Sequence, residues 1–152
     1  MEISYYKSPI GNLEIVCKNR ELISLKISND VVPEPIETDF INNIKLQLEE
    51  YFLGKRQNFD IKINLDGTDF QKRVWYELLN IPYGKTRSYS DIANKLGKAN
   101  AQRAVGLACN KNPIMIIIPC HRVVSKNGKL GGFVYGNDIK QKLLKIEKCV
   151  YD

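Results

Sequence analysis

The sequence predicts an α+β protein made of two small domains, and two changes along the chain carry this prediction. Short segments of alternating apolar and polar residues come first, and segments with helical periodicity follow them. The charge also changes: residues 1–66 hold 8 Lys and Arg against 11 Asp and Glu, whereas residues 67–152 hold 15 against 6, a net charge of +9. We therefore expect an N-terminal α+β domain over residues 1–66 and a mostly helical domain over residues 67–152.

The N-terminal domain is expected to contain strands and one helix. The segments "EISYYKS", "GNLEIVCK" and "ELISLKIS" alternate in polarity and are separated by turn residues, which predicts three strands. Residues 38–55 carry apolar side chains at a four-residue spacing and end at Gly54, which predicts a helix. These apolar residues are Phe40, Ile44, Leu48 and Phe52. Residues 59–65, "FDIKINL", are expected to add a further strand.

The second half opens with a capping signature and then shows a pair of short helices. Thr68 and Gln71 have capping-box spacing at the start of "TDFQKRVWYELL". Ser88 and Asp91 repeat that spacing ahead of the next helix, and Gly97 marks a turn before another helix that is bounded by Pro113. This order is typical of a helix-turn-helix motif. The pattern by itself is only moderately specific, because any two short helices around a glycine resemble it.

The second helix of this pair has one small apolar face and one polar face. At about 100° per residue the inward side chains are Ala101, Ala104, Val105, Ala108 and Cys109. The outward ones are Gln102, Arg103, Gly106 and Asn110. An ordinary solvated helix would also have such an outer face. Together with the net charge of +9, the lack of bulk around Arg103 favours close approach to a polyanion, and a lysine-rich soluble surface is the alternative for the charge.

The stretch "IIIPCHRVVS" places Cys120 beside His121, the single histidine of the chain. The apolar run before it predicts a buried strand that stops at Pro119, which leaves Cys120 displayed in a turn. A thiol needs a basic or cationic neighbour to become a nucleophile at neutral pH, and His121 is the available imidazole. Since adjacent side chains in an extended chain point to opposite sides, we expect a water between them rather than direct contact. A buried, inert cysteine is the alternative.

The C-terminal segment "DIKQKLLKIEKCV" predicts a helix with a carboxylate on its apolar arc. The arc is formed by Ile139, Leu143, Leu144, Ile146 and Val150. Glu147 and Lys140 fall within it. A carboxylate carried into a core requires a partner, and two hypotheses remain open. Glu147 pairs with Lys140 or with an arginine from elsewhere, or it orients His121 in a chain of the triad type.

Composition narrows the class of protein further. The four cysteines form no metal-binding spacing with the one histidine, so we expect no metal site. The N-terminus lacks the apolar core of a signal peptide, and no apolar run approaches the roughly 20 residues that cross a membrane. We expect a cytoplasmic monomer with reduced thiols and no membrane partner.

Several of these motifs together resemble one family. "PCHRV" at 119–123, "NP" at 112–113 and "QRAVG" at 102–106 are similar to the O6-alkylguanine-DNA alkyltransferases, also called methylated-DNA–protein-cysteine methyltransferases. "FQKRVWYELLNIPYGKTRSYSDIA", "GFVYG" and "LLKIE" extend the resemblance over residues 68–148, whereas the N-terminal half shares only its size and "SPIG". The resemblance implies a ribonuclease H-like N-terminal domain and a C-terminal domain with a winged-helix-like helix-turn-helix.

The resemblance also implies a reaction that needs no cofactor. Cys120 takes the alkyl group from O6 of a damaged guanine, and from O4 of alkylthymine, and keeps it as a thioether. His121 deprotonates Cys120 through a water, Glu147 holds the imidazole, and Asn112 braces the active-site turn. Each protein molecule is thereby consumed after one turnover.

For the damaged base, the resemblance assigns contacts from two sides of the pocket. Tyr89 and Lys140 assist the guanine as it leaves, and the carbonyls of Cys120 and Val123 accept from its amine. The backbone of Val134 contacts O6, where some family members have a serine. Tyr135 is bulky and is expected to narrow the pocket against large alkyl groups.

For DNA, the resemblance implies sequence-independent binding of the minor groove of a duplex. The base must leave the helix to reach a buried thiol. Arg103 would take its place in the stack, and Gln102, Gly106 and Asn110 would lie against the groove. Two functions of other classes remain as alternatives. One is a non-catalytic lesion sensor in which Cys120 is inert, and the other is a Cys-His hydrolase of small acyl substrates, which leaves Arg103 and the basic half unexplained.

Overall fold

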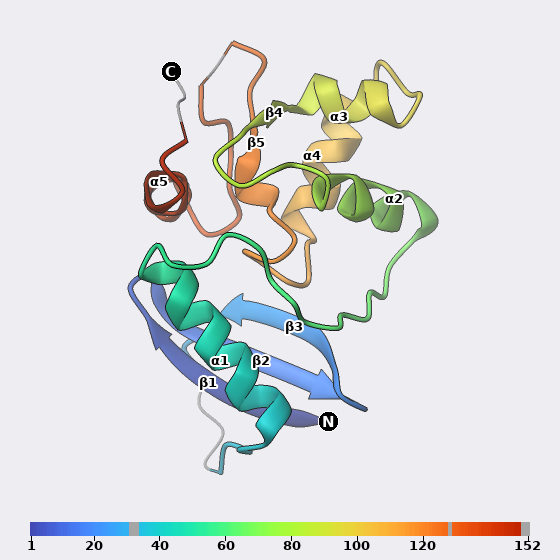
Figure 1. The fold of residues 1–152 in the computed structure, drawn as a ribbon. Helices are drawn as coiled ribbons and strands as arrows, with labels where there is room; N and C mark the ends of the chain where they lie inside the picture. The colour runs from blue at the N-terminus through green and yellow to red at the C-terminus, as the bar shows by residue number, and fades with distance from the viewer. Residues whose placement is uncertain (31–33, 128, 150–152) are drawn as a thin grey trace. The chain divides into compact units, whose positions relative to one another are not determined.

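The computed structural model describes residues 1–30, 34–127 and 129–149. It divides into two compact units, Met1–Leu65 and Asp66–Asp152. The first contains an antiparallel sheet and a helix, and the second is mostly helical, as Figure 1 shows. The predicted α+β class is confirmed.

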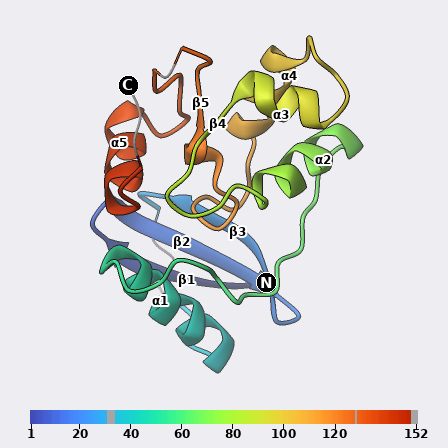
Figure 2. The same ribbon diagram turned by 45° about the horizontal axis from the view of Figure 1, so that its top comes forward.

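The first unit is a three-stranded antiparallel sheet with one helix. Strands β1 (Glu2–Ser8), β2 (Gly11–Lys18) and β3 (Glu21–Ile27) lie in chain order, and β2 is central. Helix α1 (Asp39–Phe52) lies beside this sheet in Figures 1 and 2. The Thr38 hydroxyl accepts from the N–H of Ile41 at 3.1 Å and caps α1, which confirms the helix predicted over this segment. The core of the unit consists of Leu13, Ile15, Cys17, Leu22, Leu25, Ile41, Ile44, Leu48 and Tyr51.

The strand predicted over residues 59–65 is wrong. This segment forms one isolated parallel bridge, between Ile63 and Leu22, with backbone hydrogen bonds of 2.8 and 2.9 Å on either side of Leu22. A run of alternating polarity predicts an extended chain, but a strand also requires a partner that stays in register. β3 supplies that partner at a single position.

In the second unit, three helices pack together around Trp75. They are α2 (Asp69–Leu78), α3 (Tyr89–Lys95) and α4 (Gln102–Asn110). Both predicted capping boxes are present, Thr68 with Gln71 and Ser88 with Asp91. Trp75 is buried and donates from its indole nitrogen to the Ala108 carbonyl at 2.9 Å, which ties α2 to α4. Gly97 lies between α3 and α4 at φ +72°, so the predicted helix-turn-helix order is confirmed.

The segment before Cys120 is buried as predicted, but the prediction that it forms a strand is wrong. Residues 115–117 form a turn rather than a strand, with Ile116 at φ 71° and a hydrogen bond of 3.0 Å from the Ile118 N–H to the Ile114 carbonyl. An uninterrupted apolar run indicates burial but does not distinguish a strand from compact turns. A short 3-10 helix, η1 (Cys120–Arg122), follows and leads into β5 (Val123–Val124).

Strand β5 pairs in parallel with β4 (Arg87–Ser88), directly before α3. The register joins Arg87 to Val123 and Ser88 to Val124. Because Tyr89 is the first residue of α3, this short ladder brings it close to the turn that carries Cys120. The two segments are more than thirty residues apart in the sequence.

The C-terminal helix is shorter than predicted. Helix α5 (Asn137–Ile146) ends with Glu147 as its C-cap, and Lys148 has φ 56°, in the left-handed region where a helix stops. Leu143, Leu144 and Lys140 are buried as the predicted arc requires. Val150, also assigned to that arc, lies outside the described residues. Within the described ranges, no helix combines the length and apolar character needed to cross a membrane.

Candidate active site

One amide side chain holds the turn that presents Cys120. Asn112 donates from Nδ2 to the Ile118 carbonyl at 2.8 Å and accepts at Oδ1 from the Ile114 N–H at 3.0 Å. The N–H of Cys120 donates to the same Ile118 carbonyl at 2.8 Å. The predicted bracing residue therefore lies at the base of the turn, and the thiol is 4% exposed at its end.

The carboxylate of Glu147 lies between the imidazole of His121 and the guanidinium of Arg122, the two residues that follow Cys120. Its Oε2 is 2.6 Å from Nε2 of His121, and its Oε1 accepts from Nε of Arg122 at 2.7 Å. Arg122 also donates to the Ile81 carbonyl at 2.7 Å and lies over the ring of Tyr83, with 5.8 Å from Cζ to the ring centroid. Glu147 thus pairs with an arginine, as the first hypothesis expects, and also contacts His121, while its role in a chain of the triad type remains a prediction.

The electrostatics of this buried group keep Glu147 ionised. Burial raises the pKa of its carboxyl, but the hydrogen bonds and charges of His121 and Arg122 outweigh this effect and hold the pKa at about 2. Burial lowers the pKa of His121, and the contact with Glu147 opposes that shift. The imidazole is therefore neutral near pH 7. Since Nε2 faces a carboxylate, Nε2 carries the proton and Nδ1 has a free lone pair.

That lone pair is the unusual feature of the site. Nδ1 of His121 is buried and lacks a hydrogen-bond partner among the described residues. Buried polar atoms are almost always hydrogen-bonded, so an unpartnered acceptor next to a cysteine marks a place where a proton can be received. The water predicted between Cys120 and His121 remains a prediction.

The thiol itself is held in an environment with opposing influences. Burial raises the pKa of Cys120, whereas a hydrogen bond from Asn112 and the charge of Lys140 lower it. The net direction is upward, so the resting group is a thiol. It therefore needs a base at the moment of reaction. Cys109 is also buried, and burial raises its pKa as well, so this second cysteine is also a protonated thiol at neutral pH.

Lys140 and Tyr89 meet at the loop that follows β5. The Nζ of Lys140, fully buried, donates to the carbonyls of Val123 at 2.6 Å and Gly132 at 3.2 Å. The Tyr89 hydroxyl donates to the same Gly132 carbonyl at 3.3 Å. Burial lowers the pKa of Lys140 to about 8 and raises that of Tyr89 to about 12. The structure therefore brings together three of the residues expected to contact guanine: Tyr89, Val123 and Lys140.

A hollow of about 440 Å³ opens along the outer face of α4. Its walls include five residues predicted from the sequence and two that were not. The predicted ones are Tyr89, Gln102, Arg103, Gly106 and Asn110, and the others are Leu107 and Gly132. Arg103 is exposed and forms no hydrogen bond or ion pair with the residues that the structure describes.

Five residues predicted to contact the base do not line this hollow, namely Cys120, Val123, Val134, Tyr135 and Lys140. Val134 is 52% exposed, and the ring of Tyr135 stacks edge-on against Phe133 with centroids 5.7 Å apart. The expected narrowing of the pocket by Tyr135 therefore remains a prediction.

The sequence-based prediction missed three residues, Gly132, Arg122 and Leu107. Arg122 was foreseen only as an unspecified arginine, although its place in "CHRV" made it a candidate. Leu107 was not assigned to either face of α4, yet the helical angle places it only about 40° from Arg103. An apolar side chain this close in angle to Arg103 was the available indication that Leu107 belongs to the outer face of the helix.

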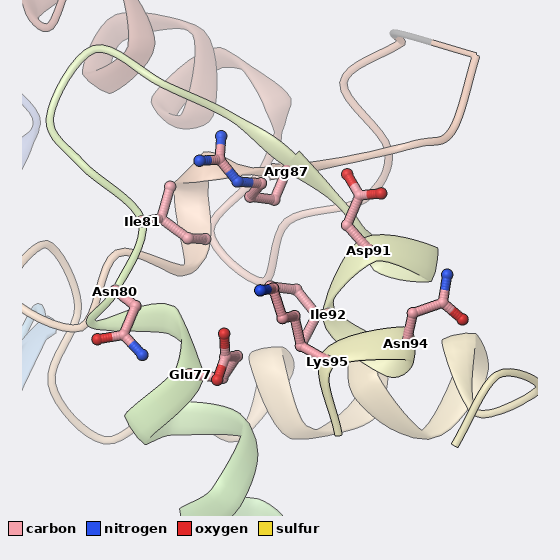
Figure 3. Close-up of a pocket in the computed structure, with 8 residues that line it drawn as sticks. All are labelled: Glu77, Asn80, Ile81, Arg87, Asp91, Ile92, Asn94 and Lys95. Atoms are coloured by element: carbon pink, nitrogen blue, oxygen red, sulfur yellow. The ribbon is translucent and has the colours of Figure 1, made fainter. Parts of the chain in front are cut away.

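A second, larger hollow of about 670 Å³ lies away from these residues, between the end of α2, β4 and α3 (Figure 3). Its walls carry charged side chains of both signs, namely Glu77, Arg87, Asp91 and Lys95. None of the predicted site residues lines it. Its size therefore does not identify it as the reactive site.

Comparison with known proteins places this geometry in a family. The family described as "6-O-methylguanine DNA methyltransferase, DNA binding domain" matches residues 69–149, and that described as the ribonuclease-like domain of the same proteins matches residues 1–65. A methylated-DNA–protein-cysteine methyltransferase of Methanosarcina barkeri is 49% identical and covers 93% of this chain and 94% of its own. One of Mycobacterium leprae is 53% identical, with coverages of 93% and 88%.

Solved structures agree. The OGT protein of Mycobacterium tuberculosis, crystallised in complex with DNA, is 43% identical, with a TM-score of 0.90 over 97% of this chain and 93% of its own. An O6-methylguanine DNA methyltransferase from Methanococcus jannaschii is 32% identical, with a TM-score of 0.70 over 95% and 92%. With both of its halves matched by the family's models, the chain belongs to the methylated-DNA–protein-cysteine methyltransferases.

Proposed function

We propose that this protein repairs alkylated DNA by moving the alkyl group from O6 of guanine, and from the equivalent O4 of thymine, onto Cys120. The observation that carries the proposal is the buried Cys120 turn with His121 behind it, whose Nδ1 is unpartnered while Nε2 is engaged by Glu147. This arrangement supplies a base for a thiol whose pKa is raised by burial.

The reaction is a single displacement. The Cys120 proton passes through a water to Nδ1 of His121, and the imidazolium that forms is stabilised by the ionised Glu147. The sulfur then forms a bond to the alkyl carbon while the bond from that carbon to O6 breaks. The electron pair stays on the guanine, where the Tyr89 hydroxyl and the Lys140 ammonium offset the developing negative charge. The thioether has no leaving route, so each molecule acts once.

Access to a buried thiol requires that the damaged nucleotide leaves the base stack. The hollow on α4 supports this step, because Arg103 stands exposed at its rim and Tyr89 forms its wall. Arg103 is proposed to fill the vacated position in the duplex, and the helix approaches the minor groove through the unbulky Gly106. A single copy of the chain suffices, since every proposed contact comes from residues 89–147.

The test is transfer of one methyl group. Incubation with a duplex that contains O6-methylguanine, followed by peptide mass mapping, is expected to add one methyl to the Cys120 peptide and none to the Cys109 peptide. Cys120→Ser should remain unmodified, whereas the matched variant Cys109→Ser should react like the parent. Tight binding without any adduct would instead establish a lesion sensor, and repeated turnover on small esters would establish a hydrolase.

A further inference from the structure

Leu107 is a large apolar side chain that α4 leaves facing solvent. It is 61% exposed, although the neighbouring Val105, Ala108 and Cys109 are buried on the other face of the same helix. Single exposed leucines are common on protein surfaces and need no special explanation. The position of this one is unusual, because it forms part of the hollow that Arg103 also lines.

Leu107 and Arg103 are the two side chains that project at this hollow. Gly106 contributes no side chain, and a Cβ built there would meet the ring of Tyr89 at 3.8 Å, so Gly106 and Tyr89 form a low surface. Arg103 and Leu107 are four residues apart and lie on the same side of the helix. Their axial separation is about 6 Å, comparable with two base-pair steps of about 3.4 Å each.

We propose that Leu107 contacts the base edges in the minor groove next to the extruded nucleotide, and that it makes repair depend on the flanking base pairs. This inference rests on the proposed function, in which Arg103 occupies the vacated position of the stack. Leu107 then lies one or two base pairs from the lesion. A·T pairs at that distance are favoured over G·C pairs.

The chemistry of the groove gives the direction of this preference. Both kinds of base pair present acceptor atoms there, so loss of water from these atoms does not distinguish them. A G·C pair adds the guanine N2 amine, which projects into the groove. An isobutyl group offers that amine no acceptor, and an unpaired buried donor is costly. Asn110, one turn further along α4, could accept from such an amine only where Leu107 does not cover it.

The experiment compares flanking sequence rather than overall rate. Two duplexes carry the same O6-methylguanine, one with two A·T pairs on each side and one with two G·C pairs. Single-turnover transfer is measured for the parent, for Leu107→Ala and for Leu53→Ala, a control leucine of equal exposure (61%) at the end of α1. Reaction with free O6-methylguanine base measures the chemistry without a groove.

The parent is expected to repair the A·T-flanked lesion about fivefold faster or more, a ratio of the size that one unpaired amine produces. Leu107→Ala should bring the ratio close to one, Leu53→Ala should retain it, and all three should react equally with the free base. A·T pairs also open more easily, so a parental ratio that persists in Leu107→Ala would overturn the inference. A parental ratio near one would overturn it too.

The affinity of each variant for undamaged A·T-rich and G·C-rich duplexes, followed by fluorescence anisotropy, gives a readout that does not depend on transfer. If neither DNA nor free base methylates Cys120, the proposed function fails, and the affinity ratio still decides the role of Leu107. An equal ratio in the parent and in Leu107→Ala then means that the leucine is an ordinary surface residue.

Discussion

At the scale of single residues, Glu147 has two buried partners at once. Its two oxygens are engaged by different neighbours, one by His121 and one by Arg122. Removing one member of a buried charged pair typically costs about 3–5 kcal/mol, because the partner is left unpaired. Loss of activity in a Glu147 variant would therefore not by itself establish a role in catalysis.

The comparison of Glu147→Gln with Arg122→Lys separates these roles. Glu147→Gln is expected to slow methyl transfer to Cys120 by at least about tenfold, because a neutral amide does not stabilise the imidazolium. Arg122→Lys should lose stability by a similar amount but keep most of the transfer rate. Both rates are measured where urea titration shows each variant folded. If Glu147→Gln is destabilised but transfers at the parental rate, Glu147 has only a structural role and the catalytic role is excluded.

The acid side of the stability profile provides a second readout. The pKa of Glu147 is about 2 in the folded protein and near 4.3 in an unfolded chain. Between pH 2 and pH 4.3 the unfolded state therefore binds a proton at this carboxyl more readily than the folded state does. This stabilisation is complete above about pH 4.5 and is lost as the pH falls toward 2, by about 3 kcal/mol. The stability difference between the parent and Glu147→Gln should shrink over that window. A constant difference would show that Glu147 is not held ionised.

At the scale of elements, helix α4 has one face packed against α2 and an opposite face that is exposed to solvent. Ala108 accepts a hydrogen bond from Trp75, which fixes the buried side of the helix against α2. The opposite side carries Arg103 and Gly106, and neither fills the hollow between α4 and Tyr89. The same nine residues thus provide a rigid attachment and a surface shaped for close approach.

For this element we expect Arg103→Ala to lower transfer from duplex DNA by at least about tenfold and to leave transfer from the free base unchanged. The reason is that, in the proposed function, Arg103 stabilises the extruded state and does not touch the reacting atoms. Lys98→Ala, which removes an equal charge from the turn before α4, controls for general electrostatics. Equal losses on both substrates, or an equal loss in Lys98→Ala, would exclude insertion of Arg103 into the stack.

At the scale of the whole molecule, charge is divided between the two halves of the chain. Residues 67–152 carry a net charge of +9 within an overall charge of +6. Such a unit binds a polyanion largely by releasing counterions. The net charge of the N-terminal unit is negative, so this charge does not contribute to the attraction.

Affinity for undamaged duplex should therefore fall steeply with salt. Contact with about four phosphates predicts a slope of log K against log salt concentration of about −3.6. Transfer from free O6-methylguanine base should be nearly independent of salt over the same range, since it has no phosphates. A slope near zero for the duplex, measured by anisotropy, would contradict binding through the basic half.

Much of the fold followed from local sequence, because capping and helical periodicity are interactions between close neighbours in the chain. Thr68, Gln71, Ser88 and Asp91 marked helix starts correctly for this reason. The extra strand at residues 59–65 and the strand before Cys120 were wrong for the opposite reason. A strand depends on partners that are distant in sequence, whereas the apolar run before Cys120 forms backbone hydrogen bonds within its own segment, from Ile117 to Met115 and from Ile118 to Ile114.

By itself the sequence determined the buried carboxylate, the basic half and the family to which these motifs belong, and it predicted the reactive pair. Only the tertiary structure decided that Glu147 serves His121 and Arg122 together, that the β4–β5 ladder brings Tyr89 beside the Cys120 turn, and that Leu107 joins Arg103 at one hollow. The physical reason is that residue type sets which chemistry is available. Burial and long-range pairing set which partners meet.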